Sequence, residues 1–353
     1  MLTSKPQNVE HAPKPFPGAP LFSIIIPVRN ELDHLGRCLD SLARLRFDRT
    51  LFETIVVDNG STDASVAVGR SFEDVFALRI LQKPEGYISA VRNVGASHAR
   101  GKYLVFLDAD CEVRPDWLDQ ASRFVSKGAE VFGCYYFIPD KSSWIASHWH
   151  ERERKDAGEV SYVPSGDLFV SRELFLHVRG FDETIQTNED VDFCRRVREA
   201  GFPVLCVPEL GVIHWGTPQS LASFFLKHRW HGAHVFRVFL RGLPSLYNAK
   251  AVALALYTMA CLFGFLAGAV IWVGSGEPRF MAIFFLVALL PAILLGIRDA
   301  VLLRRPSAAL PLLVLYFTYA IARVSSLLEW RNWVSVPKMA TQQELARTRR
   351  TGR

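Results

Sequence analysis

Two long stretches in the C-terminal third of the chain, 251–273 and 280–297, contain no charged residue. Each is close to the ~20 apolar residues that an α-helix needs to cross a bilayer. Hydrophobic residues make up 50% of the 353-residue sequence, which is high for a wholly soluble protein, and much of the excess lies here. We therefore predict two membrane helices joined by a short Gly- and Pro-containing turn. Two fully buried core helices are the alternative.

A third apolar block, 308–322, is shorter and contains Pro311. It extends the predicted transmembrane region to 251–323. The block either crosses the bilayer or turns back as a re-entrant segment.

The segment 220–250, directly before the first predicted membrane helix, is basic and aromatic and contains no Asp or Glu. This pattern is typical of an interfacial amphipathic segment that faces anionic lipid, so the net charge of +6 indicates a membrane surface and not nucleic acid. The residues concerned are Lys227, Arg229, Arg237, Arg241 and Lys250, interleaved with Phe224, Phe225, Trp230, Phe236 and Phe239.

Basic residues near the ends of membrane helices favour the cytoplasmic side. The segment 220–250 therefore places the N-terminal domain in the cytoplasm, at the inner membrane, and Arg298, Arg304 and Arg305 agree. The basic tail, 324–353, disagrees if the third block crosses fully, because its arginines would then lie on the opposite side. A re-entrant third block would remove this conflict.

The N-terminal residues and the cysteines give weaker indications of structure and location. Residues 1–20 are polar and rich in proline, which favours a disordered leader. The six cysteines show no spacing typical of zinc sites, which fits a reducing, cytoplasmic location.

Between 21 and 219, short apolar runs alternate with helical periodicity, which predicts an α/β domain with a parallel sheet and right-handed crossovers. The segment 144–160 is dense in charge and aromatic residues and is either a solvated helix or a mobile lid. We expect strands at 22–27, 54–57, 78–82, 103–107 and 212–215, and helices at 31–45, 61–71, 88–99 and 191–200, with Ser61 or Thr62 capping the second helix.

The run Tyr-Leu-Val-Phe-Leu at 103–107 ends in Asp108-Ala109-Asp110. Open α/β sheets bind ligands at the carboxyl ends of their strands, and paired carboxylates there suit a divalent cation that bridges phosphates. An Asp-rich turn is the plainer alternative for this motif alone. The strands before it also end in polar residues, Arg29-Asn30-Glu31 and Asp58-Asn59-Gly60-Ser61-Thr62-Asp63, and this coincidence favours a nucleotide site.

The motifs I-P-V-R-N-E, V-V-D-N-G-S-T-D, A-V-R-N-V-G and F-L-D-A-D, in this order, resemble those of family 2 glycosyltransferases of the GT-A fold. The resemblance covers roughly residues 22–215. It implies a Rossmann-like mixed sheet, a nucleotide-sugar donor and a divalent metal, manganese or magnesium.

On the donor side, the resemblance implies that Asp58 accepts a hydrogen bond from the base, usually uracil. Pro27, Arg29 and Glu31 would line the nucleoside pocket, and Arg92 would lie near the diphosphate. Asn59 stands where many relatives carry a second Asp, which leaves the choice of nucleotide open.

The metal site implied by the resemblance is the D-x-D motif, with Asp110 as the more direct ligand and Asp108 nearer the nucleoside. Some relatives place a metal-binding His where His214 ends an apolar strand. A lone His is more often structural, although imidazole suits manganese.

The segment Thr187-Asn188-Glu189-Asp190 resembles the family's E-D motif at the start of a helix. Inverting transfer to a hydroxyl needs a base, and Asp190, next to Glu189, is our candidate. Both residues also suit a helix N-terminus, which is the structural alternative, and Asp192 is the substitute base.

The acceptor side would include Gly166 and Asp167, because Pro164-Ser165-Gly166-Asp167 resembles an acceptor-side loop of the family. Arg229 and Trp230 resemble the end of the Q-x-x-R-W motif of processive synthases. Leu226 occupies the Gln position, which argues against a processive polymerase. Arg229 contacts a lipid phosphate or simply belongs to the interfacial helix.

The sequence thus predicts a membrane-anchored, inverting, metal-dependent glycosyltransferase of exopolysaccharide or cell-envelope assembly. Its expected donor is UDP-linked, and its expected acceptor is the hydroxyl of a polyprenyl-diphosphate-linked saccharide. One alternative is an enzyme that glycosylates polyprenyl phosphate directly. The others are a nucleotidyltransferase of related fold, disfavoured by the lack of a Gly-rich basic loop, and a non-catalytic nucleotide-sugar-binding membrane component.

Overall fold

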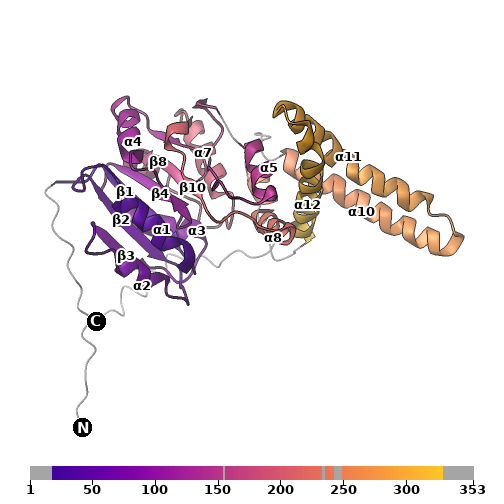
Figure 1. Cartoon of the computed structure of the whole chain (residues 1–353), viewed down its shortest axis with the longest axis horizontal. Helices are drawn as coiled ribbons and strands as arrows, with labels where there is room; N and C mark the ends of the chain where they lie inside the picture. Colours follow the sequence, from indigo (N-terminus) through magenta and orange to yellow (C-terminus); the bar gives the residue numbers. More distant parts are fainter. Residues whose placement is uncertain (1–17, 154–155, 233–234, 242–248, 329–353) are drawn as a thin grey trace, which may run out of the picture. The chain divides into compact units, whose positions relative to one another are not determined.

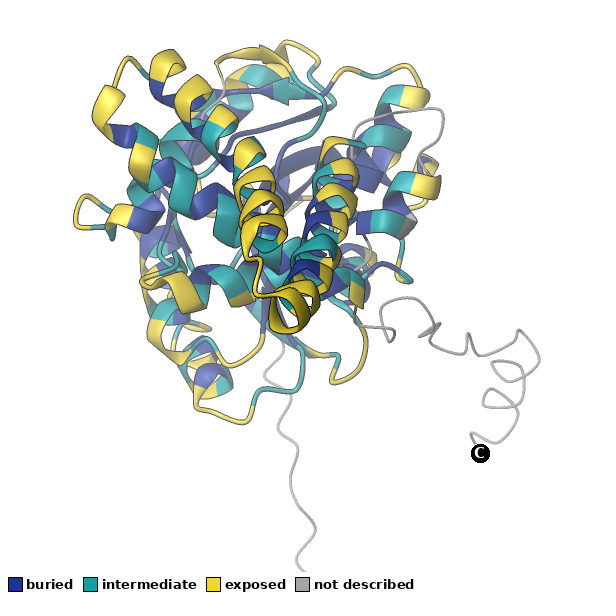
Figure 2. Cartoon of the chain, turned by 90° about the vertical axis from the view of Figure 1, so that its right-hand side faces the viewer, coloured by how far each residue is buried: buried dark blue, intermediate teal, exposed yellow. Residues whose placement is uncertain are grey.

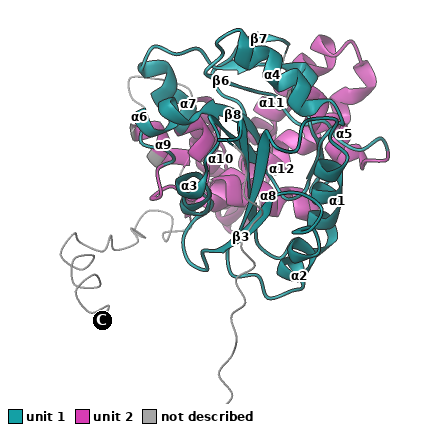
Figure 3. Cartoon of the chain, turned by 90° about the vertical axis from the view of Figure 1, so that its left-hand side faces the viewer, with its two compact units in different colours: residues 1–140, 153–181, 193–217 teal, residues 141–152, 182–192, 218–353 magenta. Residues whose placement is uncertain are grey.

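The computed structural model describes residues 18–153, 156–232, 235–241 and 249–328. The leader up to residue 17 and the tail from residue 329 lie outside this part, so the predictions made for them are not addressed by it. The chain divides into two compact units (Figure 3). Unit 1 comprises residues 1–140, 153–181 and 193–217, and unit 2 comprises 141–152, 182–192 and 218–353.

Unit 1 is built on an eight-stranded mixed sheet of order β3-β2-β1-β4-β8-β6-β9-β7 (Figure 1). Strands β3, β2, β1 and β4 are parallel, and β8 then runs antiparallel to both β4 and β6. A mixed α/β sheet was predicted and is confirmed. The strands are β1 (Phe22–Val28), β2 (Phe52–Asp58), β3 (Leu78–Gln82), β4 (Tyr103–Leu107), β6 (Val131–Gly133), β7 (Gly158–Glu159), β8 (Asp167–Ser171) and β9 (Leu205–Cys206).

Helices cover both faces of this sheet, which explains why its central strands β1, β2 and β4 are buried along their whole length. The side chains of β1 alternate between two clusters: Ile24 and Ile26 join one, and Ile25 joins the other. The first cluster includes residues of α1 (Leu32–Ala43) and α4 (Trp117–Ser126). The second includes residues of α3 (Ile88–His98), α6 (Arg172–His177) and the C-terminal half of α7 (Glu189–Glu199).

The predicted strands at 78–82 and 103–107 match β3 and β4, whereas the helix predicted at 61–71 begins later, as α2 (Ser65–Arg70). The predicted cap at Ser61 or Thr62 is therefore wrong. The Ser61 backbone N–H donates to Asp58 and the Thr62 backbone N–H donates to Asn30, so this stretch is held as a loop. Asp63 accepts from the Ser65 backbone N–H at 3.0 Å and begins the helical turn instead.

Unit 2 is helical, and three of its helices are long and apolar enough to cross a membrane. Two of them, α10 and α11, form a hairpin whose end faces the viewer, largely exposed, in Figure 2. A Cβ on Gly268 would lie 2.6 Å from the Met281 backbone nitrogen, so the two helices approach closely. The helices of unit 2 are α5 (Trp144–Glu153), α8 (Leu221–Gly232), α9 (Val235–Arg241), α10 (Ala249–Ser275), α11 (Arg279–Leu302) and α12 (Ala309–Leu328).

Glu53 is a buried carboxylate that anchors the N-terminal ends of the central strands of unit 1. The Ser23 hydroxyl donates to it at 2.7 Å, and the guanidinium groups of Arg79 and Arg100 lie at 3.0 and 2.9 Å. Burial alone would raise the pKa of Glu53, but these hydrogen bonds and charges outweigh it and lower the pKa below the ordinary 4.5. The ionised carboxylate therefore stabilises the fold above that pH.

We expect Glu53→Gln to destabilise unit 1 by about 1–3 kcal/mol at pH 7, because a charged hydrogen-bond acceptor is lost. A lowered folded-state pKa gives stability that is present above 4.5 and lost as pH falls through the folded value. The stability difference between wild type and variant should therefore shrink below that pH. Thermal unfolding between pH 3 and 7 measures it, with exposed Glu73→Gln as the control. A difference that does not change with pH would contradict this account.

Candidate active site

The polar ends of β1, β2 and β4 meet at one edge of the sheet, as predicted for parallel strands. Val28 pairs with Asp58, while Ile25 pairs with Phe106, so Asp108 follows at nearly the same level. Strand β1 lies between the other two, which puts the backbones of β2 and β4 roughly 10 Å apart. That span suits the nucleoside and phosphate parts of one ligand.

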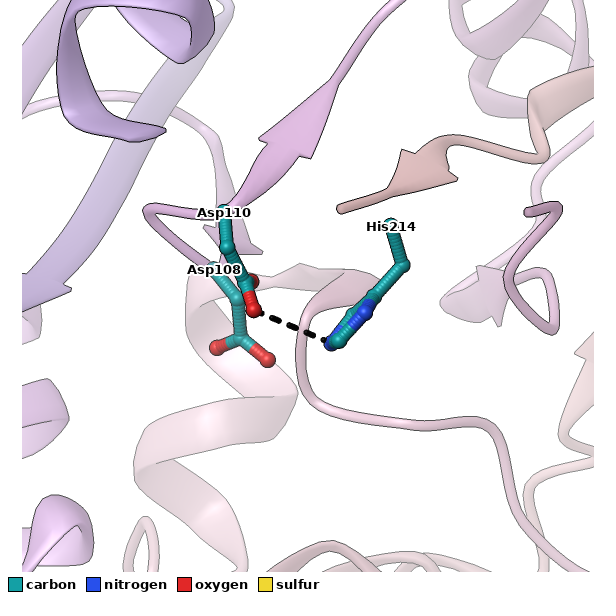
Figure 4. Close-up of side chains that lie close together, drawn as sticks. All are labelled: Asp108, Asp110 and His214. Atoms are coloured by element: carbon teal, nitrogen blue, oxygen red, sulfur yellow. Dashed lines mark ion pairs between the residues drawn. The ribbon is translucent and has the colours of Figure 1, made fainter. Parts of the chain in front are cut away.

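Asp108, Asp110 and His214 form a cluster at this edge (Figure 4). His214 is brought there by β10 (Ile213–His214), which pairs antiparallel with β5 (Cys111–Glu112) directly after the D-A-D turn. The His214 Nε2 lies 3.3 Å from an Asp110 carboxylate oxygen. One ligand atom from each residue lies within 4.8 Å of the other two. Two carboxylates and an imidazole are a donor set that fits a divalent transition metal such as manganese, whereas magnesium would use the carboxylates alone.

The two aspartates have different partners. Asp108 accepts from the Arg92 guanidinium at 2.6 Å and from the Tyr136 hydroxyl at 3.3 Å, so its orientation is fixed from within the protein. Asp110 faces the His214 ring instead. The predicted division, in which Asp110 is the more direct ligand and Asp108 lies nearer the nucleoside, remains a prediction. Arg92 is 2% exposed, and its position near a diphosphate remains a prediction.

The carboxylates of Asp108 and Asp110 lie where a side chain at either of two neighbouring glycines would be. A Cβ on Gly166 would fall 2.3 Å from Asp108 Oδ2, and a Cβ on Gly216 would fall 2.0 Å from Asp110 Oδ2. Any larger residue would displace the acidic pair. Gly166 was predicted to allow close approach of a sugar, and here its closest approach is to the Asp108 side chain.

Glu31 adds a third carboxylate to the same edge. Burial, and then the negative charge of Asp110, raise the pKa of Glu31 above its ordinary value; a hydrogen bond with His34 opposes this. Asp108 adds a smaller effect in the same direction. Negative charge is thus concentrated here, as expected where a cation binds.

Asp58, predicted to read the base, is 2% exposed and accepts from the Ser61 backbone N–H at 3.1 Å. Asn30 adopts a left-handed conformation, with φ 55°, and its side chain accepts from the Thr62 N–H at 2.8 Å. The loops after β1 and β2 therefore support each other. Pro27 is buried within β1, whereas Arg29 is exposed on the loop that follows.

Residues 23–182 match the family model described as glycosyl transferase family 2. This chain contains a family 2 glycosyltransferase domain. Glycosyltransferase AglE of Haloferax volcanii is 27% identical over 244 residues, which cover 67% of this chain and 79% of AglE. The pre-mycofactocin glycosyltransferase of Mycobacterium tuberculosis is 30% identical over 211 residues, which cover 54% of this chain but only 42% of the relative.

A solved structure with a similar fold is the mannosyltransferase PcManGT from Pyrobaculum calidifontis, in complex with GDP-Man and Mn2+. Its TM-score is 0.58 at 18% identity, with 94% of this chain and 91% of that chain covered. The predicted GT-A fold of this glycosyltransferase is confirmed.

The predicted base lies in the part of α7 that belongs to unit 2. Glu189 and Asp190 occupy the first turn, preceded by Asn188 in a left-handed conformation with φ 66°. Thr187 Oγ1 and Asn188 Nδ2 donate to the backbone carbonyl of His231 on α8 at 3.3 and 3.2 Å. The E-D segment of this glycosyltransferase is therefore tied to the predicted interfacial segment.

The remaining predicted acceptor residues lie in different surroundings. Asp167 is fully buried, on the face of β8 that joins the α1 and α4 side of the core through Phe169, and burial raises the pKa of Asp167 well above its ordinary value. In this structure its side chain does not reach the surface to contact an acceptor. Arg229 is half-buried and Trp230 exposed on α8.

Sequence reasoning missed Tyr136, which holds Asp108, and Gly216, which adjoins Asp110. It also missed the contact between Arg37 and Trp215, whose guanidinium and ring centroid lie 3.6 Å apart. The Trp215 backbone N–H donates to the Asp110 carbonyl, which fixes the register of β5 and β10. In the sequence, Trp215 and Gly216 directly after His214 were the residues that could have indicated these contacts near Asp110.

Proposed function

We propose that this chain is a membrane-anchored, inverting, metal-dependent glycosyltransferase. It transfers a sugar from a UDP-linked donor to a hydroxyl of a lipid-linked saccharide, as in exopolysaccharide or cell-envelope assembly. The observation that carries the proposal is the Asp108, Asp110 and His214 cluster at the sheet edge that also holds Asp58.

Asp110, Asp108 and His214 would hold the divalent cation, and the two adjoining glycines leave room for their side chains. When bound, such an ion supplies charge neutralisation for the departing nucleoside diphosphate. The chain itself positions the donor, because Asp58 and the loops after β1 and β2 hold the nucleoside end, and Arg92 holds Asp108. A manganese ion accompanies GDP-Man in the complex of the mannosyltransferase PcManGT, which supports a metal ion beside a nucleotide-sugar donor on this fold.

Asp190 would take the proton from the acceptor hydroxyl as that oxygen attacks the anomeric carbon and the bond to the nucleoside diphosphate breaks. Attack opposite the leaving group inverts the configuration. If the acceptor is instead a polyprenyl phosphate, its oxygen is already ionised and no base is needed. That reaction is the second candidate.

The lipid-borne acceptor is supported by the surroundings of the E-D segment. Thr187 and Asn188 hydrogen-bond to α8, which carries Lys227, Arg229 and exposed Trp230 and precedes α9 and the apolar helix α10. Basic and aromatic residues at that position favour an anionic bilayer surface. We place the catalytic domain on the cytoplasmic side by the positive-inside rule.

The proposal is tested with the purified full chain and a panel of nucleotide sugars, with and without Mn2+. We expect a UDP-linked sugar with the ion to raise the unfolding temperature, because a ligand at 100 times its Kd stabilises by about 2.7 kcal/mol. Transfer to membrane lipid extract should follow. Stabilisation without transfer or donor hydrolysis would favour the non-catalytic alternative, and transfer only to soluble acceptors would exclude the lipid acceptor.

A further inference from the structure

The three apolar helices of unit 2 differ in how much apolar surface they leave uncovered. The most apolar windows of α10 and α11 are 22% and 17% buried, and that of α12 is 39% buried. Large apolar side chains are exposed along both hairpin helices, for example Val273 on α10 and Leu286 on α11. From 311 to 327, α12 has no exposed residue. Among the described residues, most of the exposed apolar surface that lipid chains would cover therefore lies on the hairpin.

Helices α11 and α10 pack against α12, and the rest of its cover comes from α8 and from aromatic contacts with α5, neither of which is a membrane-like helix. The Trp149 ring of α5 lies 5.6 Å from Tyr316 and 5.4 Å from Tyr319. His228 of α8 lies 5.1 Å from Tyr319. Four residues further along α8, a Cβ on Gly232 would lie 2.7 Å from the Ser326 side chain, so the two helices run side by side.

Charged groups accompany α12 over its length. Arg305, just before its start, pairs with Glu151 of α5 at 2.7 Å, and Arg152 donates to the Tyr316 hydroxyl near its middle at 3.4 Å. Arg323 lies over the Tyr319 ring at 4.7 Å. From Arg305 to Arg323 the chain advances about 27 Å at 1.5 Å per residue, nearly a bilayer core. If α12 crossed the membrane, α5 and α8 would carry Glu151, Arg152 and Lys227 into the hydrocarbon.

The end of α11 gives an independent depth marker. Asp299, in the last turn of α11, pairs with Arg298 at 2.6 Å and accepts a hydrogen bond from the Tyr316 hydroxyl. The middle of α12 therefore lies level with the polar end of α11, where that helix leaves the membrane. In a third crossing parallel to the hairpin, the middle of α12 would lie at half depth. Figure 1 shows α12 running across the axis of the hairpin.

We propose that α12 is not a third membrane span. It forms, with α5 and α8, an interfacial platform (residues 144–153, 221–232 and 309–328) that rests on the anionic face of the bilayer, while only α10 and α11 cross. The chain then leaves α12 on the side of the catalytic domain. The basic tail joins Arg298, Arg304 and Arg305 on that side, which removes the conflict with the positive-inside rule.

This inference rests on the proposed membrane attachment but not on the proposed chemistry. Three exposed positions bracket the helices: Ser275 at the hairpin tip, Ser307 before α12 and Leu328 at its end. Ser275→Cys, Ser307→Cys and Leu328→Cys, made separately in the full chain, can be labelled with a membrane-impermeant maleimide in sealed vesicles of each orientation. The unsubstituted protein, whose six cysteines are all buried, gives the background.

We expect the probes at 307 and 328 to label from the same side and the probe at 275 from the other. Labelling of 328 from the side of 275 would overturn the inference and leave the membrane anchor intact. Labelling of all three from both sides would overturn the anchor itself, and with it this inference. Labelling after detergent treatment shows that each introduced cysteine is reactive, and a background no higher than that of the unsubstituted protein shows that the six native cysteines stay buried.

Discussion

Asp110→Asn should reduce sugar transfer about 10³-fold at a Mn2+ concentration that just saturates the wild type, because loss of an ion that stabilises transition-state charge is worth several kcal/mol. The substitution keeps the size of the side chain and removes one negative charge from the Asp108, Asp110 and His214 cluster. The fold should persist, because the Asp110 side chain is not buried in the core. Initial rates over a Mn2+ titration, with and without EDTA, measure the effect.

The matched control is Asp74→Asn, an exposed aspartate in a turn of unit 1, which should leave both rate and metal requirement unchanged. Asp108→Asn is expected to be more complex, because it also weakens the ion pair between Asp108 and the buried Arg92 guanidinium. An Asp110→Asn enzyme with wild-type rate and metal dependence would show that the cluster does not bind the catalytic ion.

The cluster illustrates what the sequence reveals and what it hides. Asp108 and Asp110 follow an apolar strand directly, so their place at the sheet edge follows from local pattern and parallel pairing. The contribution of His214 depends on the pairing of two two-residue strands far apart in sequence, which no local periodicity encodes. The resemblance to the family identified His214 as a candidate ligand, and the structure shows that it lies beside Asp108 and Asp110.

For Arg92 and Asp167, the structure shows buried side chains whose contacts the sequence pattern did not predict. Arg92 lies on an amphipathic helix, where periodicity gives a face but not a partner, and it pairs inward with Asp108. Asp167 follows a glycine in a loop-like motif, yet it begins β8, and its side chain falls on the core face of the sheet. A polar residue at the first position of a strand is easily taken for a loop residue.

In the membrane region, too, the sequence predicts the helices but not what packs against them. Apolar length alone predicted α10, α11 and the third block, because bilayer thickness sets that length. It could not tell whether the third block is covered by lipid or by protein, because that depends on where α5 and α8 pack. Pro311 and the shorter apolar block were the only local signals of a difference.

Asp190→Asn should lower kcat roughly 10²–10⁴-fold, the range typical of losing a general base, and leave donor binding intact. Asp190 Oδ1 accepts from the Val191 backbone N–H at 2.8 Å, and an Asn side chain keeps that oxygen, so the start of α7 should be preserved. A residue that only stabilised the helix would change stability and not turnover. Donor affinity by calorimetry, initial transfer rates and thermal unfolding separate the two roles.

Two matched variants make the result decisive. Asp192→Asn removes the substitute base two residues along the same helix, and Glu199→Gln changes an exposed carboxylate at its far end. If Asp190 is the base, only its variant loses turnover while it keeps donor affinity. If Asp192 takes the proton, the order of the two aspartates is reversed. Full activity in all three variants would mean that the acceptor oxygen needs no base, and a polyprenyl phosphate would then replace the saccharide hydroxyl as the acceptor.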